Sequence, residues 1–293
     1  MEDQVFNPKI ALVLQGGGAR GAFTAGVLDV LMEHHVTFPF VIGTSAGSLN
    51  GVNFLSGDIG RSKYVSTELM NDKKFVSFGN LIRRGSVFNF DYLFHTVPSS
   101  ILPFNQEAYD SSKVEFYAAA TRMADGKAKY FHRGEVSDFY QALAASSSLP
   151  LLAKPVLVDG ERYLDGGTAA CIPFRKPLEE GFEKIVIIET RQDAFRRPNP
   201  SKRKVLMAKL LYRRYPKFIE AYKHQGDTYN VDEDEILSLR DKGIAFVVRP
   251  DVAPDVSTTE KNKQKLTALY EVGRKIMERE LPALLDFMGV NHE

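Results

Sequence analysis

Short runs of consecutive apolar residues alternate along the chain with longer segments in which apolar residues recur every three or four positions. A continuous apolar run is typical of a strand buried on both faces, whereas the recurrence indicates a helix with one packed side. The runs are residues 9–15, 38–42, 184–189 and 244–249, and the helical segments are residues 22–35, 45–54, 61–70 and 266–288. This alternation predicts an α/β fold, and a strand–helix–strand unit at the start predicts a parallel pair of strands.

Two Asp-Gly pairs indicate tight turns between further short strands. They are Asp125-Gly126, between residues 114–123 and 127–132, and Asp159-Gly160, between residues 155–158 and 162–167. Asp-Gly suits the two-residue turns of β-hairpins, so we expect a hairpin at each pair. Residues 73–112 are rich in Phe, Tyr, Pro and Ser without a clean period and stay unassigned, and only residues 196–204 have the character of a linker.

Composition narrows the setting of the protein. The chain has 293 residues, of which 44% are hydrophobic and 26% charged, which is ordinary for a globular protein with a buried core. The single cysteine, Cys171, excludes an intramolecular disulfide, so we expect a reducing, cytoplasmic compartment. No early segment resembles a signal peptide and no apolar run is long enough to span a bilayer, so any membrane contact is expected to be peripheral. A net charge of +1 gives no overall attraction to nucleic acid.

The first candidate for chemistry is a serine between two glycines. Gly43, Ser45 and Gly47 form the pattern G-x-S-x-G directly after an apolar strand and before a helix. In a nucleophile elbow, this pattern makes a sharp strand-to-helix turn that exposes the serine Oγ. The alternative is a turn with a purely structural role, because a five-residue pattern also occurs by chance.

The second candidate is a glycine-rich loop between the first strand and the first helix. It contains Gly16, Gly17, Gly18, Arg20 and Gly21. The spacing fits the dinucleotide fingerprint, but no Asp or Glu ends the second strand to bind a ribose. A phosphate-binding P-loop is excluded because Ala22 and Phe23 stand where Lys and Ser or Thr are required.

Two interpretations of the glycine loop are left. In one, consecutive glycines let backbone N–H groups converge at a helix N-terminus and stabilise a developing oxyanion, while Arg20 adds positive potential or holds the loop. In the other, the glycines only form a turn.

A serine nucleophile requires a base. An α/β-hydrolase triad needs a histidine late in the chain, after the acid. The candidates are His34, His35, His95, His132, His224 and His292, of which only the last two follow the candidate acid. The alternative base is Asp165, which ends a short strand beside Gly166 and Gly167. Partial desolvation beside the serine would raise the pKa of this carboxyl toward the working pH and make a two-residue site possible.

Taken together and in this order, the motifs closely resemble those of the patatin-like phospholipases. The resemblance rests on the glycine loop, the serine elbow, the Asp-Gly-Gly at residues 165–167 and the block AASSSLPLLAKPV at residues 144–156. It covers about residues 10–167, and the sequence EKNKQKLTALYEVGR near the C-terminus is similar to a bacterial subgroup of the family. Gln15 departs from the small or acidic residue that many members have before the glycines.

The resemblance implies a three-layer fold with a mainly parallel central sheet and a Ser-Asp dyad that needs neither a metal nor an organic cofactor. Ser45 would be the nucleophile, Asp165 the base, and the amides of Gly17 and Gly18 the oxyanion donors. It implies a catalytic core over residues 8–190 and a C-terminal extension over residues 191–293 that packs on the core and adds a strand and a closing helix. The expected activity is cleavage of fatty-acyl esters, with a catalytically silent lipid-binding protein and, more remotely, a dinucleotide-dependent oxidoreductase as alternatives.

Two segments suggest contact with lipid. Residues 196–224 carry ten Lys or Arg and one acid, Glu220, and such a stretch suits an anionic membrane surface. Its apolar residues at helical spacing are Leu211, Tyr215, Phe218 and Tyr222. The alternative is a basic helix that packs these side chains on its own domain. The aromatic residues of 75–104 would line or cover an acyl pocket, or serve as core.

Overall fold

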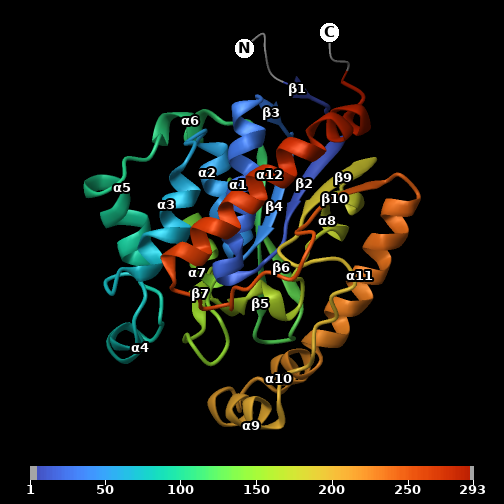
Figure 1. Cartoon of the computed structure of the whole chain (residues 1–293). Coiled ribbons are helices and arrows are strands. Elements are labelled where there is room, and N and C mark those ends of the chain that lie inside the picture. The colour runs from blue at the N-terminus through green and yellow to red at the C-terminus, as the bar shows by residue number, and fades with distance from the viewer. Residues whose placement is uncertain (1–4, 291–293) are drawn as a thin grey trace.

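A mixed sheet lies between two layers of helices in the computed structural model, which describes residues 5–290 (Figure 1). The strand order is β10-β9-β2-β4-β5-β8-β7, and β6 pairs with β5 off this path. The strands are β2 (Ile10–Leu14), β4 (Phe40–Thr44), β5 (Glu115–Arg122), β6 (Ala128–His132), β7 (Val156–Val158), β8 (Glu161–Asp165), β9 (Lys184–Ile188) and β10 (Ala245–Val248). Strands β10, β9, β2, β4 and β5 are parallel, and β6, β7 and β8 run antiparallel to their neighbours. The predicted α/β class with a mainly parallel sheet is confirmed.

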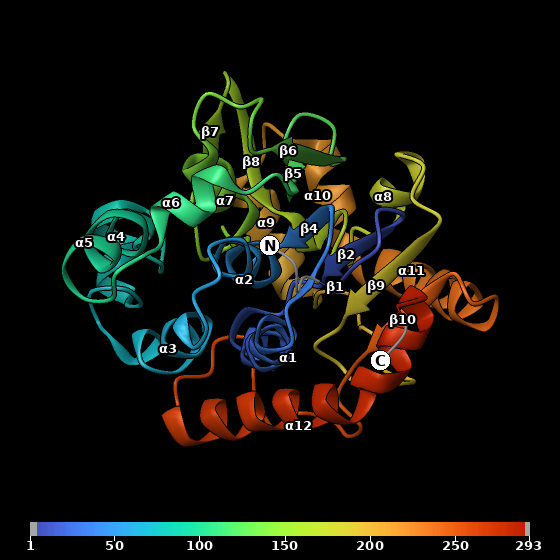
Figure 2. The same ribbon diagram turned by 90° about the horizontal axis from the view of Figure 1, so that it is seen from above.

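The central strands β2, β4 and β9 are almost entirely apolar because both of their faces are covered. Leu12 and Leu14 of β2 belong to one hydrophobic cluster, whereas Ala11 and Val13 belong to another on the opposite face. Figure 2 shows the sheet between α1 and α12 on one side and α8 and α11 on the other. The helices of these layers are α1 (Gly21–Glu33), α2 (Ala46–Leu55), α3 (Arg61–Thr67), α8 (Arg175–Glu179), α11 (Gln225–Asp241) and α12 (Lys263–Met288). Within residues 5–290, none of the helices has the length and apolar character required to cross a bilayer.

Both predicted hairpins are confirmed. Strands β5 and β6 pair around Gly126, and β7 and β8 pair around Asp159 and Gly160, all three of which have positive φ. Helix α7 (Phe139–Ser146) packs on this antiparallel end of the sheet. Residues Val5–Phe6 (β1) and Val36–Thr37 (β3) form a separate two-stranded sheet that was too short to predict.

The unassigned segment 73–112 contains several short helices at one edge of the molecule. They are α4 (Phe78–Arg84), a π-helix (Tyr92–Thr96), α5 (Val97–Ser100) and α6 (Gln106–Ser111). Rings within this segment pack on one another, with centroids 5.7 Å apart for Phe75 and Phe88 and 5.9 Å apart for Phe88 and Phe90. Each helix is too short to show a period in the sequence.

The basic segment 196–224 differs from its predicted form. It contains two helices, α9 (Lys202–Leu211) and α10 (Pro216–Lys223), because Pro216 begins a new helix after the break at residues 212–215. Phe218 and Tyr222 are buried in a cluster with Tyr212, so most of the apolar stripe packs on the protein itself. The division into residues 8–190 and 191–293 stays a prediction.

Candidate active site

Ser45 occupies a sharp turn between β4 and α2. Its backbone has φ 55° and ψ −123°, a conformation that L-residues rarely adopt. At Gly47, a Cβ atom would stand 2.4 Å from the carbonyl oxygen of Leu14, so only glycine fits the first turn of α2. The Ser45 N–H donates to Ser146 Oγ (2.9 Å), and Ser146 Oγ donates to the Ala119 carbonyl (2.6 Å). Ser146 therefore ties the elbow to β5.

Sheet register explains how the chain brings Asp165 to this turn. Strands β4 and β8 pair along the same edge of β5 and run toward each other. The last paired residue of β4, Thr44, lies opposite Ala119, and the last of β8, Asp165, lies opposite Ala120. Two strands of opposite direction thus end at adjacent positions of β5, and the residues that terminate them become neighbours.

The Asp165 carboxyl is buried, with 3% of the residue exposed. Its Oδ1 accepts from the Gly167 N–H (2.7 Å), whereas Oδ2 has no hydrogen-bond partner of normal geometry among residues 5–290. Burial raises the pKa of Asp165 to about 6, although the nearby Ser45 hydroxyl, the Gly167 N–H and the Arg197 guanidinium favour the charged form. A carboxyl with this pKa and an open oxygen can accept a proton near neutral pH.

Histidine does not compete for this position in the part of the chain that the structure describes. The cavity lined by Ser45 and Asp165 has no histidine in its wall. His224 instead lies by Glu220 (3.0 Å) and Asp227 (2.8 Å), and His132 lies by Glu115 (2.6 Å). His292 falls outside the described residues. The described geometry therefore favours Asp165 as the base.

The glycine loop lies beside the elbow and presents two N–H groups. Within residues 5–290, neither Gly17 N nor Gly18 N donates to a protein acceptor, whereas Ala19 N donates to the Thr258 carbonyl (2.9 Å). Gly18 has φ +57°, and a Cβ atom there would stand 2.4 Å from the Thr258 carbonyl oxygen. Both glycines line the cavity that contains Ser45. Their geometry suits oxyanion donors, and that role stays a prediction.

Arg20, predicted together with the oxyanion glycines, connects the glycine loop to the segment before α12. Its guanidinium donates weakly to Val256 O (3.4 Å) and Thr258 Oγ1 (3.3 Å), in the segment before α12. The remaining predicted glycines are Gly16, Gly21, Gly43, Gly166 and Gly167, and a Cβ atom added at each would lie nearest to Thr44, Ala46, Gly47, Ala119 and Asp165 respectively. The three loops therefore pack directly on one another around the Ser45 turn.

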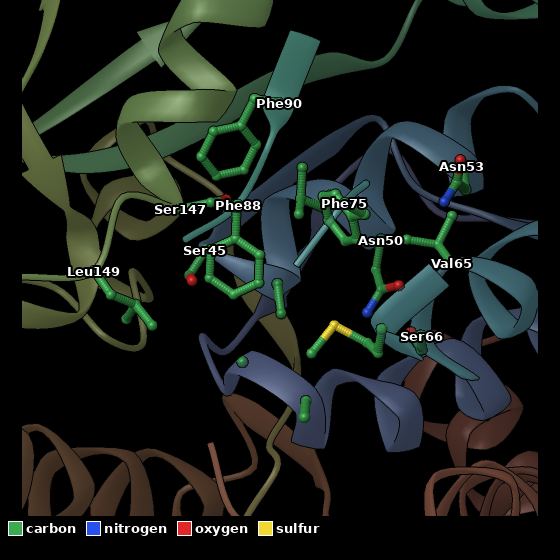
Figure 3. Close-up of a pocket in the computed structure, with 15 residues that line it drawn as sticks. Ser45, Asn50, Asn53, Val65, Ser66, Phe75, Phe88, Phe90, Ser147 and Leu149 are labelled. Atoms are coloured by element: carbon green, nitrogen blue, oxygen red, sulfur yellow. The ribbon is translucent and has the colours of Figure 1, made fainter. Parts of the chain in front are cut away.

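An apolar pocket opens on one side of Ser45 (Figure 3). Phe75, Phe88 and Phe90 line it, together with Leu49 and other apolar side chains of α2 and α3. A second apolar pocket shares Leu49 with the first and reaches Phe94. Aromatic residues of the segment 75–104 thus line two neighbouring apolar pockets, the first of which has Ser45 in its wall. We call these two pockets together the apolar path, and a fatty-acyl chain suits such surroundings.

A larger polar cavity of about 360 Å³ opens on the other side of Ser45. Arg20, Arg191 and Arg197 line it, and Asp165 is the only acid in its wall among residues 5–290. No motif pointed to Arg191 and Arg197 as site residues, because both lie in the irregular segment after β9. Ser45 therefore lines both the apolar pocket and the basic polar cavity.

Two supporting residues also escaped prediction. Gln15 accepts from both the N–H and the hydroxyl of Thr190 and donates to Tyr229 OH (2.9 Å), which joins the ends of β2 and β9 to α11. Ser146 lies in the serine-rich block that was noted only for its resemblance. Such long-range contacts leave no local pattern in a single sequence.

Comparison with known families gives two matches. The family described as patatin-like phospholipase matches residues 12–178, more than half of the chain, and includes the glycine loop, the elbow and the Asp-Gly-Gly. A domain of unknown function (DUF6363) matches residues 215–289, which include α11, β10 and α12.

This chain matches only part of the length of each curated relative. The uncharacterized protein YjjU of Escherichia coli K12 is 33% identical over 192 residues, which are 63% of this chain and 53% of YjjU. The lysophospholipase nte1 of Emericella nidulans is 30% identical over 169 residues, which are 54% of this chain and 10% of that protein. Among solved structures, human GIVD cytosolic phospholipase A2 aligns with a TM-score of 0.46 at 12% identity, covering 99% of this chain and 60% of that one.

Proposed function

The chain belongs to the patatin-like phospholipase family, and we propose that it is a serine lipid acyl hydrolase that cleaves fatty-acyl esters of phospholipids or lysophospholipids. The observation that carries the proposal is that the buried Asp165 Oδ2, beside the strained Ser45 turn, has no hydrogen-bond partner of normal geometry among residues 5–290. The apolar path, which has Ser45 in its wall, supports an acyl substrate.

The proposed reaction has two halves. In the first, Asp165 accepts the Ser45 proton while Oγ attacks the ester carbonyl, and the N–H groups of Gly17 and Gly18 stabilise the tetrahedral oxyanion. The intermediate collapses to an acyl-enzyme as the leaving alcohol takes the proton from Asp165. In the second half, Asp165 accepts a proton from water as the water oxygen attacks the acyl group. Collapse then releases the fatty acid and returns the proton to Ser45.

Substitution of the nucleophile tests the proposal. Ser45→Ala should abolish both hydrolysis of short-chain acyl esters and covalent labelling by a fluorophosphonate, while Ser99→Ala, at an exposed serine on α5, should retain both. Labelling is measured by the mass of the intact protein and hydrolysis by release of the fatty acid. Equal hydrolysis by Ser45→Ala and the parent would refute the proposal. A parent protein that binds lipid without labelling or turnover would instead be the catalytically silent alternative.

Peripheral contact with a membrane is the second part of the proposal, and the surface of α9 supports it. Leu206, Met207, Leu210 and Leu211 are between 43% and 71% exposed, although each is strongly apolar. Residues 202–219 carry seven Lys or Arg and no acid. An exposed apolar patch within a basic surface suits an anionic lipid interface.

The position of α9 relates this surface to the candidate active site. Ser201 and Lys204, at the start of α9, line the same polar cavity as Ser45. A membrane bound to α9 would therefore lie close to the cavity, and a lipid could enter the cavity and reach Ser45 directly from the membrane. A cytoplasmic location, expected from composition, stays a prediction.

A further inference from the structure

The polar cavity beside Ser45 gathers positive charge that the protein does not neutralise. Arg20 comes from the glycine loop, and Arg191 and Arg197 come from the segment that follows β9. Among residues 5–290, no Asp or Glu forms a salt bridge with any of the three, whereas eight of the other fifteen arginines are paired. Of the acids that the structure describes, Asp165 alone lies in the cavity wall.

The contacts of these arginines are with neutral groups. Arg197 donates to the Gly167 carbonyl (2.9 Å) and to the Gln225 side chain (2.9 Å). The guanidinium of Arg191 lies 4.4 Å from the ring centroid of Phe195. These contacts hold the side chains in place and leave their charges uncompensated.

Arg20 is the most confined of the three side chains. It is 8% exposed, and its Nε has no hydrogen-bond partner among residues 5–290. Burial, followed by the neighbouring charges of Arg191 and Arg197, lowers the pKa of Arg20 to about 10. Three like charges around one cavity repel each other, and an anion bound between them would remove that repulsion.

We propose that this cavity binds the phosphate of an anionic lipid headgroup, so that the enzyme prefers acyl esters with net negative charge over zwitterionic or neutral ones. The inference rests on the proposed function, since it concerns the substrate of the same serine. Arg is suited to the role because its planar guanidinium donates two parallel hydrogen bonds to phosphate. The apolar path and the basic cavity then receive the two ends of one molecule, with the ester between them at Ser45.

The positive charges in the cavity wall also disfavour zwitterionic headgroups. A choline or ethanolamine group would bring a positive charge into a cavity that already holds three guanidinium groups and the Lys204 ammonium. Within the described part of the chain, Asp165 is the only carboxylate that lines it, and this group is assigned to proton transfer. Phosphate with a neutral glycerol, or phosphate alone, fits the charges of the wall.

The test compares four soluble, short-chain monoacyl substrates that share one acyl group. They are lysophosphatidate, lysophosphatidylglycerol, lysophosphatidylcholine and monoacylglycerol, all used as monomers so that attraction to a charged surface does not contribute. We expect kcat/KM for the two anionic substrates to exceed that for the other two about tenfold or more, as a charge-assisted contact to phosphate would give. Equal kcat/KM for all four would overturn the proposal.

Substitution of Arg191 locates the preference in the cavity. Arg191→Gln should lower the ratio of anionic to neutral kcat/KM about tenfold, and Arg191→Lys should preserve most of it. Arg196→Gln is the matched control, because Arg196 lies in the same segment but pairs with Asp234 (2.6 Å) outside the cavity. The thermal unfolding of each variant shows whether it is folded. A ratio unchanged in Arg191→Gln would contradict the assignment.

Inhibition by inorganic phosphate and by glycerol 3-phosphate tests whether the cavity binds a lipid headgroup or a free anion. Competitive inhibition of monoacylglycerol hydrolysis by these anions, together with an anionic preference among the four substrates, supports the proposal. Inhibition without that preference would assign the cavity to a free phosphate compound and overturn the headgroup assignment. Failure of the proposed function has a different signature, because Ser45→Ala would then hydrolyse all four substrates as the parent does.

Discussion

Ser45 and Asp165 acquire their properties from where the backbone holds them. The elbow gives Ser45 a backbone conformation that only surrounding contacts can maintain, and Gly47 and Ser146 supply two of these contacts. Burial of Asp165 outweighs the effect of the nearby Arg197 guanidinium, so its carboxyl holds a proton more tightly than an exposed aspartate does. An ordinary carboxylate is a weak base toward serine, and the raised pKa of Asp165 brings it closer to the strength that the proposed chemistry needs.

The pKa of Asp165 predicts the pH dependence of hydrolysis. The proposed base acts only when it is deprotonated, and burial raises its pKa to about 6. We therefore expect kcat/KM for a short-chain ester to be low at acidic pH, to rise through about pH 6 and to level off above it. An exposed aspartate would place this rise near pH 4. Initial rates at constant ionic strength across this range measure it.

Replacement of the carboxyl supplies the control for this profile. Asp165→Asn should lower kcat/KM by about 10²–10⁴-fold, because general-base assistance contributes roughly this factor. The remaining activity should lose the rise near pH 6. A variant that keeps both the rate and the rise of the parent would show that another group is the base.

Strands and hairpins were predictable because their signals are local. The buried parallel strand β2 is uniformly apolar, β9 is apolar after Lys184, and an Asp-Gly pair permits the positive φ that a tight turn requires. The segment 73–112 was not predictable, because its short helices depend on capping and aromatic contacts rather than on a period. Ser77, for example, caps α4 by accepting from the Asn80 N–H (3.1 Å).

Helix α9 carries the exposed apolar residues of the basic segment 196–224. The helical spacing of Leu211, Tyr215, Phe218 and Tyr222 indicated a helix there, but the break before Pro216 places these residues on two helices with different surroundings. Phe218 and Tyr222 of α10 are buried, and the exposed apolar side chains lie on α9 instead. Of the four exposed apolar residues in the proposed membrane surface, the periodicity singled out only Leu211.

Two leucines of α9 provide the test of membrane contact. Leu206 and Leu210 are 59% and 71% exposed, so the double variant Leu206→Ser/Leu210→Ser should fold normally. Burial of a leucine in an apolar environment stabilises by about 1.5–3 kcal/mol, so loss of two such side chains should weaken binding to anionic vesicles at least tenfold. Sedimentation with phosphatidylglycerol vesicles measures the bound fraction.

A leucine elsewhere on the surface serves as the comparison. Leu157→Ser changes a side chain that is 50% exposed on β7 and should leave the bound fraction as in the parent. Fluorophosphonate labelling in solution checks that the site of each variant is intact. If the α9 variant sedimented with the vesicles as the parent does, α9 would not be the membrane surface.

The candidate site depends on parts of the chain that lie far apart in sequence. The glycine loop binds Thr258, the elbow binds Ser146, and the Gly167 carbonyl accepts from Arg197. The resemblance to a known family predicted the serine, the aspartate and the glycines because these residues form motifs. Contacts with residues 191–258 could not be predicted, because each depends on how an irregular segment returns to the core.

Helix α12 also packs on the core far from its neighbours in sequence. It crosses α1 at a point where both helices have a glycine. A Cβ atom at Gly273 would stand 2.2 Å from the Phe23 carbonyl oxygen, and one at Gly26 would stand 2.1 Å from the Tyr270 carbonyl oxygen. Side chains at either position would force the backbones apart. Because α1 follows the glycine loop directly, a shift of α12 would be transmitted to the candidate oxyanion donors.

Gly273→Ala should therefore destabilise the entire chain. Overpacking of a close contact costs about 1–3 kcal/mol, or more where backbone atoms are involved, so we expect Tm to fall by several degrees in a single cooperative transition. Gly79→Ala on α4 is the control, because the nearest atom to its added Cβ is Ser77 Oγ at 3.7 Å and alanine favours a helix. If Gly273→Ala unfolded residues 191–293 separately while Ser45 still reacted with a fluorophosphonate, the extension would be an independent unit, and its contacts with the glycine loop would not be needed to form the site.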